Sequence, residues 1–143
     1  MSRPRDIGTR AESAIRKVCQ ASGFPYAERN PLYGAKDRGD INITPGVIAE
    51  VKSGKAAETA SDAQIAKWLG ELETARVNAG ALFAILVTKR AGIGHGNAHR
   101  WWAHTTLDGL FQVVDVPMVY PTDDLHVRLT LADLLTLLKR EGW

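Results

Sequence analysis

Seven consecutive apolar residues, from Ala81 to Val87, constrain the fold of this chain more than any other feature of its sequence. The run shows no alternation of apolar and polar side chains, which is typical of a central strand covered on both faces. It is far too short to span a bilayer, so we expect no membrane partner. Because such a strand needs helices on both sides of its sheet, the run predicts an α/β fold.

Periodic patterns elsewhere in the chain predict the remaining elements. Helices are expected over residues 9–22, 61–78 and 130–140, a β-hairpin over 40–52, and a further strand over 101–107. The glycine-rich residues 91–97 are predicted to form a flexible loop. Together these elements give the order α-β-β-α-β-β-α, a mixed sheet flanked by helices in a single domain over residues 1–143.

Cysteine content and charge narrow the setting in which the protein works. The single cysteine, Cys19, cannot form a bridge within the chain, and the first residues lead into no apolar segment, so a reducing cytoplasm is the expected location. The formal net charge is only +2, but no acidic residue lies between Glu73 and Asp108. This distribution favours a polyanionic partner and a solvated basic face about equally.

Two acidic residues and a lysine share one face of the predicted hairpin. Alternation puts Asp40, Glu50 and Lys52 on this face, although acidic residues are uncommon in strands. A three-residue loop would place Asp40 opposite Glu50, whereas a two-residue Pro-Gly turn would need a bulge to do so. Burying two carboxylates together is costly unless a cation or a proton offsets their repulsion. A divalent metal such as Mg²⁺ would offset it and activate a water that the lysine holds, and the alternative is an ordinary exposed salt-bridge cluster.

The same residues carry a resemblance to a known enzyme superfamily. Asp40, followed after a turn by Glu50-Val51-Lys52, resembles the Asp…Glu-x-Lys core of the PD-(D/E)xK nucleases. A helix with a glutamate precedes this core and a helix with Gln64 follows it, and this order is similar to that of archaeal-type Holliday junction resolvases and their phage relatives. One departure is Gly39, which stands where the family commonly has a proline that shapes the entry to the strand and does no chemistry.

The resemblance covers residues 8–88 and implies a fold, an activity and a set of site residues. The implied fold is a restriction-endonuclease-like core, and the implied activity is metal-dependent, structure-selective endonucleolytic cleavage of DNA by a homodimer acting on a four-way junction. Such a small nuclease would suit a phage or prokaryotic recombination system. The implied metal is Mg²⁺ or Mn²⁺, with Asp40, Glu50, Glu12 and the Val51 carbonyl as ligands. The implied catalytic residues are Glu12, Asp40, Glu50, Lys52 and Gln64, the last of which helps to order the metal-bound water.

Several of these residues have a competing structural interpretation. Glu12 stands three residues after Thr9, and Gln64 three residues after Ser61, so each can belong to a capping box at the start of a helix. Contacts to DNA phosphates are expected from Lys36, Arg38, Lys55, Lys89, Arg90 and Arg100. Solubility would explain the exposure of these basic residues equally well.

Two other functions remain open at this point. A RecB-like exonuclease or a nicking repair enzyme of the same superfamily would use the same residues. A non-catalytic DNA-binding module on the same fold is less favoured, because Asp40, Glu50 and Lys52 are all present.

A tryptophan pair, Trp101-Trp102, lies on the predicted strand over residues 101–107. Its rings could stack on bases. Paired tryptophans on a strand more often put one ring into the core, and we favour that interpretation.

Overall fold

The computed structural model describes residues 4–30, 37–117 and 125–143. Its sheet has the strand order β1-β2-β3-β4-β5-β6, in which β3 and β4 are parallel and the other neighbours antiparallel. The strands are β1 (Glu28–Arg29), β2 (Ile41–Thr44), β3 (Val47–Lys52), β4 (Phe83–Thr88), β5 (Trp102–Thr106) and β6 (His126–Thr130). The helices are α1 (Pro4–Ala21), α2 (Lys55–Glu58), α3 (Asp62–Ala79), α4 (Leu107–Val113), α5 (Leu131–Arg140) and the 3₁₀ helix η1 (His95–Arg100). The predicted α/β fold with a mixed sheet is therefore confirmed.

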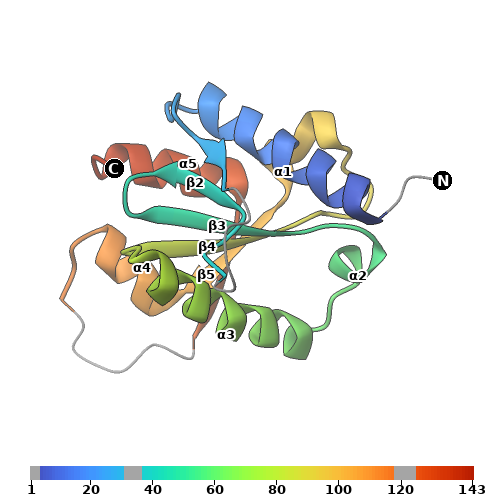
Figure 1. Ribbon diagram of the computed structural model, residues 1–143. Helices are drawn as coiled ribbons and strands as arrows, with labels where there is room; N and C mark the ends of the chain where they lie inside the picture. The colour runs from blue at the N-terminus through green and yellow to red at the C-terminus, as the bar shows by residue number, and fades with distance from the viewer. Residues whose placement is uncertain (1–3, 31–36, 118–124) are drawn as a thin grey trace.

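Helices cover both faces of the sheet, with α1 and α5 on one side and α3 and α4 on the other (Figure 1). Every residue of β4 is buried in the middle of this arrangement. Phe83, Ile85 and Val87 belong to the core under α1 and α5, whereas Ala84 and Leu86 pack toward α3. The apolar run thus forms the doubly covered strand that its sequence predicts. No helix in the described ranges is both long enough and apolar enough to cross a membrane.

The hairpin of β2 and β3 combines a two-residue turn with a β-bulge. Thr44 pairs with Val47 across Pro45-Gly46, but the register shifts between Asn42 and Thr44, so that Ile41 pairs with Ala49. This one-residue shift brings Asp40 level with Glu50, which a Pro-Gly turn alone would not do. The predicted division of the hairpin into two faces is also confirmed, because the alternate side chains enter the two different cores.

Three features of the predicted layout are wrong. Helix α1 begins at Pro4, five residues before the predicted start, so Thr9 lies inside the helix and does not cap it. The predicted loop over residues 91–97 extends only as far as Gly94, because η1 begins at His95. The predicted order also lacks β1, α2, α4 and β6, which are short and carry little periodic signal.

The buried face of α5 provides a test of the fold. Leu135→Ala is expected to lower the free energy of unfolding by about 2–5 kcal/mol, because Leu135 is fully buried and the truncation leaves a cavity. Leu82→Ala is the matched control, since Leu82 is 62% exposed, and its effect should stay within about 0.5 kcal/mol. Urea denaturation of both variants checks the difference, and equal losses would contradict the described core.

Candidate functional site

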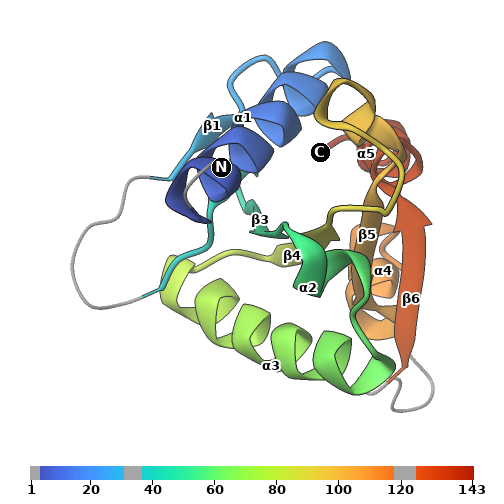
Figure 2. The same cartoon turned by 90° about the vertical axis from the view of Figure 1, so that its right-hand side faces the viewer.

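The candidate site lies where the paired part of the hairpin ends. Figure 2 shows β3 and β4 ending on the side of the molecule between α1 and α3, with α2 beside them. The Asp40 N–H donates to the Ala49 carbonyl at 2.9 Å, and the Val51 N–H donates to Asp40 Oδ2 at 2.8 Å. The Asp40 carboxylate therefore takes over the position that the backbone of β2 would occupy one step further along the ladder.

Glu50 lies beside Asp40 with one oxygen unpartnered. Its side chain is only 14% exposed, its Oε1 is 3.9 Å from the Lys52 Nζ, and its Oε2 is buried without a hydrogen-bond partner among the residues described. Burial, followed by the nearby Asp40 charge, raises the pKa of Glu50 to about 8. Burial also raises the pKa of Asp40 to about 6, although the hydrogen bond from Val51 opposes this rise. The pair is thus short of positive charge.

Lys52 is the cation nearest to this pair for which the structure gives a contact. Its Nζ is 3.9 Å from Glu50 Oε1 and 5.6 Å from the centre of the Trp68 ring, which sits on α3. The first distance is too long for a hydrogen bond, so the ammonium donors remain available for a third group. Helical periodicity carries no signal for this contact between Trp68 and the lysine, so the sequence did not predict it.

The backbone conformation of Gly39 is incompatible with a proline before Asp40. Its φ is +85°, a backbone conformation that proline cannot adopt. A Cβ atom at this position would lie 3.1 Å from the Ile48 Cδ1 and 3.3 Å from the Ala49 carbonyl oxygen. The chain therefore enters β2 through a turn that requires glycine, and Asp40 reaches its position without the proline.

Glu12 is bound to a basic partner that the sequence did not suggest. Both Arg29 Nε and Arg29 Nη2 lie 2.8 Å from Glu12 Oε2. The capping box with Thr9 is wrong, and so is the placement of Glu12 in the first turn, because α1 starts at Pro4 and puts Glu12 in its third turn. The Glu12 charge still contributes to the raised pKa of Asp40, so the two carboxylates lie within electrostatic reach of each other. A metal-ligand role for Glu12 stays a prediction.

For Gln64 and Val51, the structure gives contacts of the backbone N–H groups but none of the atoms predicted to act in the site. The Ser61 Oγ accepts a hydrogen bond from the Gln64 N–H at 3.1 Å, so the predicted cap of this helix is confirmed while the side-chain role of Gln64 stays a prediction. The Val51 N–H points to Asp40, and the carbonyl of a strand residue points to the same side as its N–H. The Val51 carbonyl therefore faces the side of the site, as its predicted role as a ligand requires.

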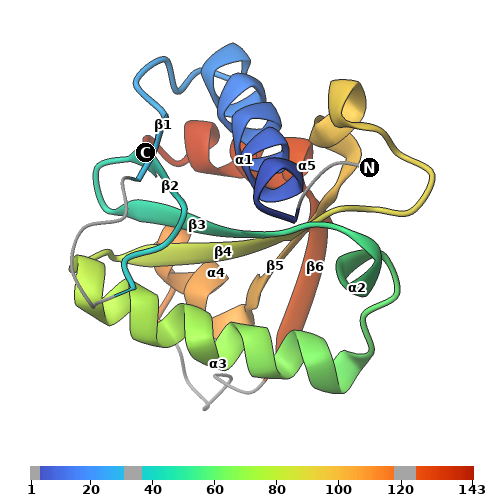
Figure 3. The same cartoon turned by 45° about the vertical axis from the view of Figure 1, so that its right-hand side comes forward.

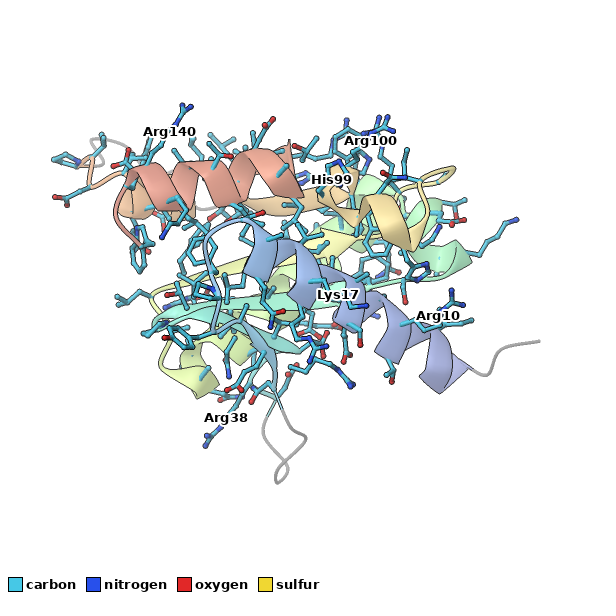
Figure 4. All side chains as sticks on the ribbon, turned by 90° about the horizontal axis from the view of Figure 1, so that it is seen from above. Arg10, Lys17, Arg38, His99, Arg100 and Arg140 are labelled. Atoms are coloured by element: carbon cyan, nitrogen blue, oxygen red, sulfur yellow. The ribbon has the colours of Figure 1, made fainter. Side chains whose placement is uncertain are left out.

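The predicted DNA contacts do not form one patch. Lys89 and Arg90 follow β4 at the site end, where the Lys89 N–H donates to the Lys52 carbonyl, and Lys89 is also ion-paired with Glu58 of α2. Lys55 is exposed at the start of α2. Figure 4 shows Arg38 and Arg100 at opposite edges of the molecule. Lys36 lies outside the described residues.

The side chains available to bind a metal at the site are the carboxylates of Asp40 and Glu50. Within the described part of the chain, no three His, Cys, Asp or Glu side chains are grouped so that they could hold a metal ion. Mg²⁺ needs only one or two protein carboxylates, because water and substrate phosphate complete its shell. Comparison with protein-family models, curated proteins and solved structures gave no match to this chain.

The burial of Glu50 predicts a specific pH dependence of stability in metal-free buffer. Its pKa of about 8 in the folded protein exceeds the ordinary 4.5, so the folded state binds the proton more tightly and this contribution to stability is lost as the pH rises through that interval. Glu50→Gln has no charge to bury, and it should exceed the wild type in stability by roughly 2–4 kcal/mol near pH 9 and match it near pH 4.

Denaturant unfolding over this pH range measures the effect. Glu141→Gln is the control, because Glu141 is exposed near the end of the chain, and it should follow the wild-type curve. A Glu50→Gln curve parallel to that of the wild type would contradict the burial of an uncompensated carboxylate.

Proposed function

We propose that this chain is a metal-dependent endodeoxyribonuclease that cleaves branched DNA, as its resemblance to Holliday junction resolvases implies. The observation that carries the proposal is the buried Asp40–Glu50 pair, which has an unpartnered Glu50 Oε2 and a lysine 3.9 Å from the other oxygen. Two buried carboxyl groups in this setting either keep a proton or bind a cation. In a metal-dependent nuclease, such carboxyl groups bind a cation.

A divalent metal fits this set of donors. Mg²⁺ prefers hard oxygen ligands, which Asp40 and Glu50 would supply as carboxylates and Val51 as a carbonyl. Glu12 would join them through Oε1, because its Oε2 is hydrogen-bonded to Arg29. Bound there, the metal would lower the pKa of a coordinated water and neutralise charge on the phosphate.

Lys52 is placed to act on the nucleophile. Its ammonium is within 4 Å of Glu50 but not hydrogen-bonded to it, so it can donate to a water held between the carboxylates and the phosphate. The same charge stabilises the negative charge that develops on the phosphate during the attack. Contact with the Trp68 ring keeps the long side chain on the site side of α3.

Selection of DNA by shape would follow from phosphate contacts around the site. Arg38 precedes Asp40 and Lys55 follows Lys52 closely in the chain, and both are exposed. Contacts of this kind position a duplex without reading its sequence. A four-way junction has two-fold symmetry and needs two paired nicks, so a C₂ homodimer with one site in each copy would match it.

Cleavage of a labelled synthetic four-way junction in Mg²⁺ tests the proposal directly. Linear duplex and single strand of the same sequence are incubated in parallel, and a sample with EDTA should show no cleavage. Lys52→Ala is expected to lower the rate by about 100-fold or more, because it removes the group that holds the water. Lys17→Ala, an exposed lysine on α1, is the control and should cleave like the wild type.

Each outcome assigns a function. Paired symmetric nicks on the junction alone, lost in Lys52→Ala, would support a resolvase. Degradation of linear DNA from its ends would indicate an exonuclease with the same site. Binding without cleavage, equal in the wild type and Lys52→Ala, would overturn the catalytic proposal.

Metal affinity is expected to rise with pH. The pKa values of about 6 for Asp40 and about 8 for Glu50 mean that metal binding must displace protons at neutral pH. The apparent affinity for Mn²⁺ should therefore increase about tenfold or more between pH 6 and pH 8, with proton release. Calorimetric titration in two buffers of different ionisation enthalpy measures both quantities. Affinity independent of pH, or unchanged in Glu50→Gln, would place the metal elsewhere.

A further inference from the structure

A second group of cations lies on the same face of the sheet as the candidate site. Trp102 of β5 is half-buried, and its ring centre lies 4.0 Å from the Arg90 Cζ and 4.1 Å from the Arg128 Cζ. Arg90 follows β4 and Arg128 belongs to β6, the two strands on either side of β5 (Figure 3). The neighbouring Trp101 is fully buried in the core under α1 and α5, so the interpretation that one ring of the pair packs inward is confirmed.

Among the described residues, no acid is in a salt bridge with either guanidinium group at Trp102. The four ion pairs found in the described ranges involve residues other than Arg90 and Arg128. Holding two like charges against one ring is unfavourable, and cation–π contacts of about 0.5–1 kcal/mol each offset only part of that repulsion. An anion that binds both guanidinium groups would offset the repulsion between their charges.

The stacked geometry leaves donors free for such an anion. A guanidinium group stacks through its flat face, whereas its five N–H donors lie in its plane. The Arg90 Nη1 donates a hydrogen bond to the Arg100 carbonyl at 3.3 Å, which leaves its other N–H groups available. Arg128 is exposed on β6. The planar fork of donors matches the oxygens of a phosphate. The guanidinium groups also occupy the ring of Trp102, which argues against base stacking there.

The pairing of the strands places this group at a fixed distance from the site. Lys52 pairs with Thr88, and Thr88 pairs with Trp102, so the three residues form one row across β3, β4 and β5. Two strand spacings separate Lys52 from Trp102, which corresponds to ~10 Å.

We propose that Arg90, Trp102 and Arg128 form a phosphate clamp that holds the DNA backbone two strand spacings, or ~10 Å, from Lys52 of the candidate site. The assignment of the partner as DNA rests on the proposed function. The two arginines contact the phosphate, and Trp102 is a positioning residue that keeps their planes aligned. The clamp fixes the distance between the bound backbone and the site and reads no sequence.

Metal-free DNA binding tests the clamp. Fluorescence anisotropy with a labelled four-way junction in EDTA, repeated at several salt concentrations, gives the affinity and its dependence on salt. Arg128→Ala should weaken binding and reduce the slope of log K against log salt by about 0.9 for each phosphate that the protein no longer neutralises. Arg128→Lys keeps the charge but not the planar fork, so it should recover the slope and only part of the affinity.

Arg140→Ala is the matched control, because Arg140 is an exposed arginine at the end of α5, well away from Arg100 in Figure 4. It should bind like the wild type. The clamp would be overturned by wild-type binding in Arg128→Ala, by an equal loss in Arg140→Ala, or by full recovery of affinity in Arg128→Lys.

The binding assay separates the two proposals. It requires no catalysis, so wild-type cleavage of DNA without an effect of Arg128→Ala on binding would overturn the clamp alone. Failure to cleave any DNA in Mg²⁺, together with a clear loss of binding in Arg128→Ala, would overturn the nuclease alone. Circular dichroism of each variant checks that the sheet is intact, and the exposed position of Arg128 favours an intact fold.

Discussion

The hydrogen bond from the Val51 N–H to the Asp40 carboxylate determines the geometry of the whole site. Backbone pairing between β2 and β3 ends with the bond from Asp40 to Ala49, and the next donor of β3 is satisfied by a side chain instead of by backbone. The aspartate is therefore positioned by the ladder itself. The same bond opposes the rise that burial causes in the pKa of Asp40.

Short ion pairs surround the candidate site, whereas the two acids within it have no comparably close cation. Acids and bases further out are paired with each other, as in Glu12 with Arg29 and Lys89 with Glu58. Glu50 has only a long ion pair, with Lys52 Nζ 3.9 Å from its Oε1, and Asp40 is in no salt bridge among the described residues. A protein that only needed stability would gain by replacing a buried, uncompensated pair with apolar residues. The retained acids are therefore better explained by a ligand than by the fold.

Local patterns predicted the parts of this structure that depend on neighbouring residues. The apolar run of β4, the two faces of the hairpin and the cap at Ser61 all follow from spacing within a few residues. The sequence could not predict the bulge in β2, because a two-residue turn with a bulge and a three-residue loop are compatible with the same alternation of side chains. Only the strand register in the structure distinguishes the two hairpins.

Contacts between distant parts of the chain account for what the sequence did not predict. Glu12 meets Arg29 across 17 residues, and Trp102 meets Arg128 from a strand that no periodicity indicated. Thr9 and Glu12 have the spacing of a capping box, yet α1 continues back to Pro4, a residue type that the first turn of a helix tolerates. A capping motif marks a position where a helix can begin, but whether the helix begins there also depends on the residues that precede the motif.

The parallel pairing of β3 with β4 also determines when the site loses its water. Residues 40–52 form a hairpin around a two-residue turn, and such hairpins form within microseconds. We expect the pairing of β3 with β4 to follow, because it must close the chain that includes α3. In that order, Asp40 and Glu50 would meet while they are still hydrated and would be buried only afterwards. At neutral pH the last stage of folding is thus coupled to proton uptake, and a divalent cation that takes the place of the proton would become a participant in folding itself.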